Sequence, residues 1–219
     1  MKVIALGGSV LFGDFDTDTL KKFAEVINQY SGKLAIVVGG GRVARKYIES
    51  ARSLGADEVT CDMIGIAVTR INASILAVAV ENCPVMIPED FVTAKEILER
   101  YGRVIMGGTF PGHTTDAVSA LLAEFLKADE LLIATSADGV YTKDPRFHRD
   151  AEKIEKLTSD ELVEIVSVNS TEAGGSSVVD LLASKIIQRS RIRTRIFYGT
   201  PENLRKALNG EKIGSIVVS

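Results

Sequence analysis

The feature that most restricts the fold of this chain is an apolar run that ends in three consecutive glycines. Residues 34–38 are all apolar, and residues 39–41 are all glycine. Arg42 and Arg45 follow within one helical turn. A short run rich in Val predicts a strand buried on both faces. Glycines allow a sharp turn and a close approach to the backbone, and a helix N-terminus offers free N–H groups to a phosphate. The stretch predicts a strand, an anion-binding turn and a helix, with a purely structural glycine turn as the alternative.

Strand-like and helix-like segments alternate along the whole chain. Apolar runs predict strands at residues 2–6, 34–38, 85–87, 104–106, 131–135, 194–197 and 215–218. Apolar residues three and four apart predict helices at residues 20–30, 42–54, 60–80, 91–101, 117–127, 158–166, 178–190 and 201–208. This alternation predicts an α/β fold, a three-layer αβα sandwich with a mainly parallel central sheet. We expect a single domain, residues 1–219, with residues 167–177 as its most linker-like stretch.

The composition is that of a globular protein that lacks the positive charge needed to attract nucleic acid. The chain has 219 residues, of which 46% are hydrophobic and 25% are charged, and its net charge is −3. A chain of this length buries a large core. A negative net charge gives no general attraction to nucleic acid, so we expect no nucleic-acid partner. An anionic ligand must therefore be held by local groups.

We expect a cytoplasmic protein with no membrane partner. The N-terminus resembles a signal peptide, since Lys2 precedes an apolar run at residues 3–12, but two glycines interrupt that run and no cleavage site follows. No stretch reaches the about 18–20 consecutive apolar residues that span a bilayer. Cys61 and Cys83 belong to no C-x-x-C pair or metal-ligand spacing, which predicts buried, reduced thiols and no protein metal centre.

Several predicted strands end in glycine or small polar loops. These loops are residues 7–9, 39–41, 107–116 and 136–139. In an open α/β sheet, ligands bind at the carboxyl ends of the parallel strands. Several such ends at one edge form a trough lined with backbone donors. One phosphate does not need so many donors, so the pattern favours two phosphorylated ligands that face one another.

Two familiar nucleotide motifs do not explain these loops. Residues 39–44, GGGRVA, formally match the dinucleotide fingerprint G-x-G-x-x-A. That site needs a second strand that ends in an acid about 20 residues further on. Here Asp57, Glu58 and Asp62 stand before a predicted helix instead. The chain has no G-x-x-x-x-G-K-[ST], H-E-x-x-H or G-x-S-x-G motif.

Four motifs together resemble the amino-acid kinase family. They are GGS after the first strand, VVGGG followed by R-x-x-R, the loop GGTFPGHTTDA, and T-x-x-DGVYTKDP. Within that family they are most similar to the archaeal UMP kinase branch. The match continues through the late DLLASKI helix and the closing GSIVV strand, in order over almost the whole chain. Each motif alone is weak, but the ordered set is highly specific.

The resemblance implies an ATP site on one side of the trough. The residues that it places at the ATP phosphates are Gly8, Ser9, Gly41 and Arg45. The residues that it places at the nucleoside are Thr135, Tyr141 and Asp144. From the residues alone, ordinary packing remains an alternative for Tyr141. Lys143 is either a phosphate contact or a solvated loop lysine.

The resemblance implies a UMP site on the other side. Its residues are Gly40, Asp62, Phe110, Pro111, Gly112, His113, Thr114, Thr115 and Asp116. Asp62 accepts from a ribose hydroxyl or is simply an acid in the first turn of its helix. The hydroxyls of the two threonines donate to the UMP phosphate. His113 is either a further donor or an exposed histidine, and Asp116 is both a candidate N-cap and the family's organising carboxylate.

The implied reaction is direct in-line transfer of the ATP γ-phosphate to UMP, which gives UDP for pyrimidine nucleotide biosynthesis. Mg²⁺ accompanies ATP, and no phospho-enzyme forms, because phosphoryl transfer depends mainly on positioning and cations. Two alternatives stay open. One is a related phosphotransferase that acts on a carboxylate, a carbamate or an isoprenoid phosphate. The other is a nucleotide-binding protein that has lost turnover.

One residue departs from the family pattern. Many members carry a lysine two residues before the first glycine pair, where this chain has Ala5. Arg42, Arg45, Lys143 and Lys185 are the candidate replacements. We favour Arg45, because it lies one turn into the helix that faces the phosphates, and we expect Arg45 and Asp116 to be catalytic.

The predicted helix at residues 60–80 is almost uncharged. Its polar interruptions are Asp62, Arg70 and Asn72. So much apolar surface indicates burial against another subunit as well as against the sheet. The resemblance implies a homohexamer.

Overall fold

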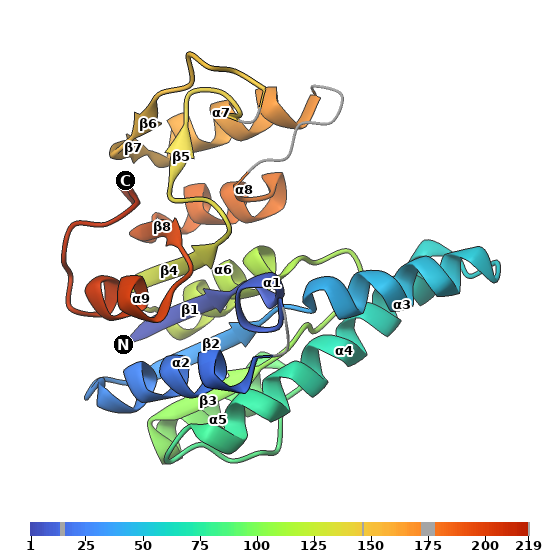
Figure 1. Ribbon diagram of the computed structural model, residues 1–219. Coiled ribbons are helices and arrows are strands. Elements are labelled where there is room, and N and C mark those ends of the chain that lie inside the picture. Colours follow the sequence, from blue (N-terminus) through green and yellow to red (C-terminus); the bar gives the residue numbers. More distant parts are fainter. Residues whose placement is uncertain (14–15, 146, 172–177, 219) are drawn as a thin grey trace.

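The central feature of the fold is a sheet of seven strands (Figure 1). A computed structural model describes residues 1–13, 16–145, 147–171 and 178–218, and of residues 169–171 it describes the backbone alone. In order across the sheet, the strands are β3 (Arg103–Met106), β2 (Leu34–Val38), β1 (Lys2–Leu6), β4 (Glu130–Thr135), β8 (Thr194–Tyr198), β9 (Ser215–Val218) and β7 (Lys156–Thr158). The first five are parallel. β9 runs antiparallel to β8, and β7 is parallel to β9. The predicted mainly parallel sheet is confirmed.

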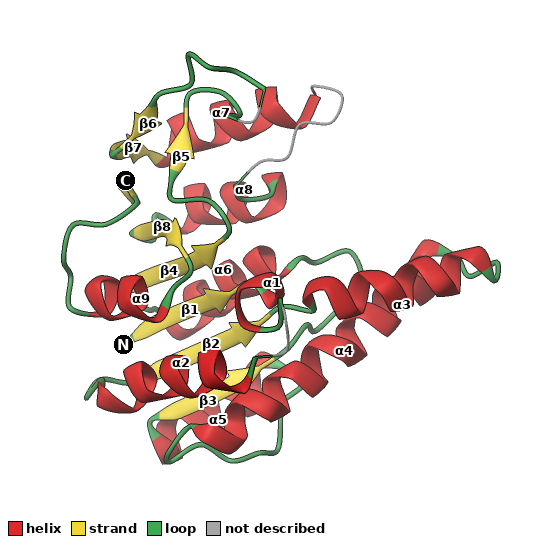
Figure 2. Ribbon diagram, viewed as in Figure 1, coloured by secondary structure: helices red, strands yellow, loops and turns green. Residues whose placement is uncertain are grey.

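Helices cover both faces of this sheet (Figure 2). They are α1 (Gly8–Leu11), α2 (Thr17–Gln29), α3 (Gly41–Ser53), α4 (Glu58–Ala79), α5 (Phe91–Tyr101), α6 (Thr115–Leu126), α7 (Ser159–Thr171), α8 (Leu181–Ser190) and α9 (Pro201–Leu208). Alternate side chains of a strand point to opposite faces. Thus Val3 and Ala5 of β1 pack with α5, α6 and α8, whereas Ile4 and Leu6 pack with α2, α4 and α9. The three-layer αβα sandwich is therefore confirmed.

The predicted strand at residues 85–87 is wrong. The structure has no strand there, and Val85 and Met86 are exposed. Pro84 and Pro88 flank this short run. Proline has no N–H to donate to a neighbouring strand, so three apolar residues between two prolines do not join a sheet.

The region after β4 contains strands that the sequence did not predict. β5 (Val140–Tyr141) and β6 (Lys153–Ile154) form an antiparallel pair, and β7 lies at the edge of the main sheet. α7 continues to Thr171 instead of ending at residue 166, so part of the linker-like stretch is helical. Residues 172–177 of that stretch lie outside the described residues. α8 begins at Leu181 rather than at residue 178, because Asp180 caps it.

The longest helix of the described residues, α4, has an apolar composition. By length and composition alone it is suited to cross a membrane, because it contains few charged residues among many apolar ones. In the structure it packs against α2, α3, β2 and β3. Figure 1 shows α3 and α4 side by side, extending beyond the tips of the strands. These contacts are those of a helix within the folded domain.

The two cysteines are free thiols. Cys61 is buried, as predicted, whereas Cys83 is only partly buried. Burial raises the pKa of the Cys83 thiol to about 11. Cys83 therefore stays protonated at neutral pH.

A buried ion cluster joins three strands at the amino-terminal edge of the sheet. The Glu130 carboxylate of β4 accepts from Lys2 Nζ of β1 at 2.8 Å and from Arg195 Nη2 of β8 at 3.1 Å. Lys2 Nζ also donates to the carbonyls of Ala207 and Leu208 at the end of α9. The Arg195 and Glu130 side chains are 1% and 7% exposed, so water screens this cluster little.

We expect Glu130→Gln to destabilise the fold strongly. The change leaves the buried Arg195 and the partly buried Lys2 without a counter-charge, and removal of one partner of a buried pair costs about 3–5 kcal/mol. Urea unfolding at pH 7 measures the loss. Glu58→Gln is the matched control, because it breaks the exposed ion pair between Glu58 and Arg52 and should leave the midpoint unchanged. Equal effects of the two changes would contradict a structural role for the cluster.

Candidate active site

The glycine loops lie along one edge of the sheet, as predicted. The five strands β3, β2, β1, β4 and β8 are parallel and adjacent, so their carboxyl ends share that edge. Along the edge, the loop at 107–114 comes first, then the glycines at 39–41, then the turn at 7–9, and then the loop at 136–139. β1 lies between β2 and β4. The chain order therefore reverses across β1, which is where ligands bind in open α/β sheets.

The turns after β1 and β2 are in backbone contact at the centre of this edge. Gly39 N donates to Leu6 O at 2.9 Å. A Cβ added to Gly8 would lie 2.1 Å from Gly41 N and 2.5 Å from Gly39 O. Gly41 itself has a φ of +64°, a conformation that favours glycine. The centre of the edge therefore presents main chain without side chains.

The N-terminus of α3, at this same point, has no capping side chain. Gly40 is the N-cap residue, and it offers no side-chain acceptor. Every other helix of eight or more residues in the described part of the chain begins with a capping hydroxyl or carboxylate. These caps are Asp16, Asp57, Asp90, Thr114, Thr158, Asp180 and Thr200. The free N–H groups of α3 therefore suit an anion from outside the chain.

The candidate cations differ in whether another group of the protein already binds their side chains. Arg45 of α3 is exposed, and its side chain makes no ion pair or hydrogen bond within the described residues. Arg42 donates to Gly13 O. Lys143 Nζ is bound to Asp150 Oδ2 at 2.6 Å, which disfavours its role as a phosphate contact in this state. Lys185 is exposed on α8. Arg45 therefore remains the favoured cation.

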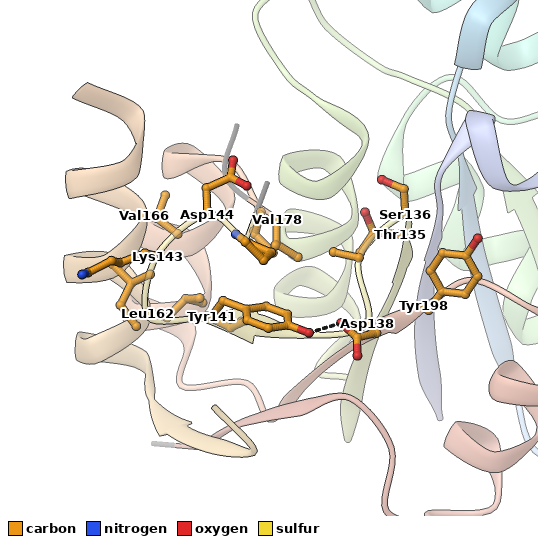
Figure 3. Close-up of a pocket in the computed structure, with 15 residues that line it drawn as sticks. Thr135, Ser136, Asp138, Tyr141, Lys143, Asp144, Leu162, Val166, Val178 and Tyr198 are labelled. Carbon is orange, nitrogen blue, oxygen red and sulfur yellow. Dashed lines mark hydrogen bonds between the residues drawn. The ribbon is translucent and has the colours of Figure 1, made fainter. Parts of the chain in front are cut away.

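A cavity of about 430 Å³ lies at the end of β4 (Figure 3). It is lined by all three residues predicted to hold the ATP nucleoside, Thr135, Tyr141 and Asp144. Tyr141 Oη donates to Asp138 Oδ1 at 2.8 Å, and Figure 3 shows this hydroxyl directed at Asp138. In the same view Lys143 points away from Thr135.

Part of the cavity wall was not predicted from the sequence. The residues missed include Tyr198 of β8 and the apolar side chains of Leu162, Val166 and Val178, whereas Asp138 lies in the predicted loop at 136–139. Apolar walls with a few polar groups are typical of small-molecule sites. The signal for α7 and β8 was only their apolar pattern, which is the same for any core element.

The loop at 107–114 lies at the other end of the edge, and α4 holds it. Asp62 Oδ2 accepts from Gly112 N at 2.7 Å, and Thr69 Oγ1 accepts from Gly108 N at 2.7 Å. Arg70 Nε donates to Gly108 O at 3.2 Å. α4 begins at Glu58, so Asp62 lies beyond its first turn. The alternative that Asp62 is merely a first-turn acid is wrong.

Two aromatic rings mark the tip of this loop. Phe110 is 67% exposed, and its ring centroid lies 6.2 Å from that of His113. His113 Nδ1 is buried and has no partner among the described residues. Pro111 and Gly112 complete the turn between them. The structure thus brings Asp62 and residues 110–113 together, as predicted.

Thr114, Thr115 and Asp116 follow the loop tip and lie nearer the centre of the edge. Thr114 Oγ1 accepts from Ala117 N at 3.1 Å, so Thr114 is the N-cap of α6 and the prediction of Asp116 as N-cap is wrong. Thr114 also donates to Asp180, the N-cap of α8. A Cβ added to Gly39 would lie 3.0 Å from Thr115 Oγ1, which places Thr115 against the central glycines.

Asp180 acts electrostatically on Asp116, and the sequence did not predict that these two acids lie near each other. Burial, together with the negative charge of Asp180, raises the pKa of Asp116 from 3.8 to about 7. Asp180 was missed because only tertiary packing of α8 on α6 brings it to the site. Its one local signal is an aspartate that directly precedes a helix.

We expect this pair to make stability depend on pH. The pKa of Asp116 is higher in the folded state than in the unfolded chain, so the folded state binds this proton more tightly. The contribution is full below about pH 4 and is lost as the pH rises through about 7. Urea unfolding of the wild type should therefore lose up to about 4 kcal/mol between these limits, relative to Asp116→Asn.

Asp116→Asn serves as the reference because all other titrating groups are shared. The two proteins are unfolded at half-unit steps of pH. A constant difference in the free energy of unfolding across the range would show that Asp116 titrates normally.

Comparison with known proteins adds to this geometry. The model of a family described as the amino acid kinase family matches residues 1–198. A uridylate kinase of Archaeoglobus fulgidus is 49% identical over 217 residues, which cover 98% of each chain. A uridylate kinase of Methanococcus vannielii is 48% identical over 222 residues, covering 99% of this chain and 98% of the relative.

Solved structures agree with these relatives. The crystal structure of the uridylate kinase from Archaeoglobus fulgidus superposes with a TM-score of 0.92, at 48% identity over 99% of both chains. A UMP kinase from Bacillus anthracis gives a TM-score of 0.81 at 23% identity, covering 99% of this chain and 95% of that one. The second likeness concerns the fold alone.

Proposed function

Because the chain belongs to the amino acid kinase family, we propose that it is a UMP kinase, which transfers the γ-phosphate of ATP to UMP. The observation that carries the proposal is the uncapped start of α3 between a cavity and a loop at opposite ends of one edge. Relatives named uridylate kinase, at 45–49% identity over nearly the full length, support it.

ATP occupies the β4 side of the edge in this proposal. Its base enters the 430 Å³ cavity beside Thr135, Tyr141 and Asp144. An aromatic ring offers the base a large apolar face. Its phosphates extend toward the residues of the two central turns, which are Gly8, Ser9, Gly41 and Arg45.

UMP occupies the β3 side. Its phosphate approaches Gly40, Thr114 and Thr115, and its nucleoside lies near Asp62 and the loop tip. The γ-phosphate of ATP and the single phosphate of UMP then meet over the N–H groups at the start of α3. Fixed dipoles at the place where charge redistributes stabilise a transition state without reorganisation.

Arg45 and Asp116 carry the catalytic roles in this proposal. Arg45 supplies positive charge to the transferring group, in place of the lysine that is absent at position 5. Loss of one such stabiliser slows turnover by roughly 10²–10³-fold. Asp116 organises the cations and hydroxyls around the phosphates. Direct in-line transfer needs no nucleophilic side chain, so no phospho-enzyme forms.

Mg²⁺ fits the charge of this site as the companion of ATP. Burial raises the pKa of Asp116 and the charge of Asp180 raises it further, so a cation beside these two carboxylates would favour their ionised form. Mg²⁺ in kinase sites is bound by one or two carboxylates and the substrate phosphates. Asp116 and Asp180 are the carboxylates that would hold it. When bound, the ion neutralises charge on the phosphate oxygens.

A coupled assay of ADP release tests the acceptor. We expect turnover with ATP and UMP, less with CMP, and none with acetylglutamate or isopentenyl phosphate. Turnover with another acceptor alone would identify a related phosphotransferase. Nucleotide binding without any turnover would identify the non-catalytic alternative, which stays open because Ala5 stands where many family members have a lysine.

Asp62→Asn checks the assignment of the two sides in the same assay. The change weakens the acceptor for Gly112 N, so it should raise the KM for UMP several-fold and leave the KM for ATP unchanged. Equal increases in both constants would contradict the assignment.

We also propose a homo-oligomer, a hexamer, that acts in the cytoplasm in pyrimidine nucleotide biosynthesis. The physical support is one stripe of exposed apolar side chains along α4, at about one residue per turn. Its members are Val59, Met63, Ile71, Ile75 and Val78, which are 58%, 61%, 60%, 38% and 75% exposed, together with the exposed Ala67 between Met63 and Ile71. A continuous exposed apolar stripe marks an interface.

A charge in the middle of this stripe should break the assembly. We expect Ile71→Glu to shift the protein to a smaller species in light scattering, because the charge opposes burial of the stripe. Lys22→Glu, an exposed change on α2, is the control and should leave the mass unchanged. An unchanged mass for Ile71→Glu would contradict an interface on α4.

A further inference from the structure

An asparagine lies almost completely buried in the middle of α4. Asn72 is 1% exposed, and its helical neighbours Ala73, Leu76 and Ala77 are apolar core residues. Asparagine is a poorer helix former than alanine by roughly 0.6 kcal/mol. A buried side-chain amide also has to be hydrogen-bonded. An apolar residue would suit the helix better, so the amide has a local purpose.

The Asn72 side chain binds the turn after β2. Its Nδ2 donates to Gly39 O at 2.9 Å and to Gly40 O at 3.3 Å. These hydrogen bonds hold two successive carbonyls toward α4. In a trans peptide the following N–H points in the opposite direction. The N–H groups of Gly40 and Gly41 are therefore directed away from Asn72.

Those two N–H groups are free in the described part of the chain. Neither Gly40 N nor Gly41 N donates a hydrogen bond there. α3 also lacks a capping side chain at the same place. Two free amides at a helix N-terminus suit a phosphate. These two observations are independent. The buried Asn72 side chain holds the turn from behind, and the N–H groups of Gly40 and Gly41 in front have no partner in the described part of the chain.

The turn needs such a clamp because it consists of glycines. Three consecutive glycines adopt many backbone conformations at little cost. A rotated peptide in this turn would direct a carbonyl oxygen, instead of an N–H, at an anion. A side-chain NH₂ group offers two donors to two carbonyls. It is also neutral, so it adds no competing charge.

We propose that Asn72 is a positioning residue for phosphoryl transfer, which fixes the Gly40 and Gly41 amides toward the transferring phosphate. The inference rests on the proposed function. Gly40 belongs to the UMP side and Gly41 to the ATP side, so these amides lie between the two ligands. Misplaced amides weaken the transition state, whereas the nucleosides at the distant ends of the edge keep their contacts.

Kinetics of Asn72→Asp test the proposal. The change keeps the shape of the side chain and replaces its NH₂ group with an oxygen that repels the two carbonyls. We expect kcat with ATP and UMP to fall by about 10–100-fold, while both KM values change by less than about threefold. Asn72→Ser, which keeps one donor, should lose less. Ser74→Ala is the matched control on the same helix, since among the described residues Ser74 Oγ donates only to Arg70 O, and it should leave kcat unchanged.

A second measurement does not depend on turnover. Backbone amide signals of Gly40 and Gly41 are followed by NMR as a non-hydrolysable ATP analogue is added. We expect both signals to shift in the wild type and in Ser74→Ala, and not in Asn72→Asp. Asn72→Ser serves in both experiments if Asn72→Asp does not fold.

The outcomes separate the two claims. Absence of UDP formation by the wild type would overturn the proposed function, and the NMR comparison would still decide the role of Asn72. A folded Asn72→Asp variant would overturn the positioning role if its kcat lay within about twofold of the wild type, or if its Gly40 and Gly41 signals shifted on addition of the analogue as they do in the wild type.

Discussion

The structure depends on the contact between the backbone turns that follow β1 and β2. Gly8 lies so close to Gly39 and Gly41 that no side chain fits between them. Because of this close contact, the turns after two adjacent parallel strands expose backbone groups, without side chains, at one point. The start of α3 follows directly, with its amides unfilled. The elements on either side of this point can then hold separate ligands.

The two sides differ in how they are built. On the β4 side, the cavity is walled by apolar side chains of α7 and by Tyr198 at the end of β8. On the β3 side, polar side chains of α4 fix a loop through its main chain. The apolar cavity suits contact with the flat face of a base, whereas main-chain groups fixed by hydrogen bonds suit recognition of a ligand through its polar groups. The two ends of the edge are therefore suited to different ligands.

The sequence predicted the parts of the site whose signals are local. Buried apolar runs and glycines are visible without a structure, so the parallel sheet and the central turns were predicted correctly. The polar interruptions of α4 were noticed but only Asp62 was given a role. In the structure Asp62, Arg70 and Asn72 all bind loops of the active edge. A polar residue inside an apolar helix was thus the signal for these contacts.

Other parts had no local signal. β5 and β6 have two residues each, too few for any periodicity, and they form because the cavity loop folds back on itself. Asp180 and Tyr198 reach the site through packing of elements distant in sequence. Residues 85–87 show the opposite error, in which an apolar run suggested a strand although prolines prevented one.

The place of β9 in the sheet has a consequence for how the sheet forms. β7 joins the main sheet only through β9 in the described part of the chain. β7 therefore has no partner strand until residues 215–218 pair with it. The five parallel strands and their glycine turns pair with one another without β9. We therefore expect the β3 half of the edge to form independently of the wall near α7, which closes only when β9 joins β8 to β7.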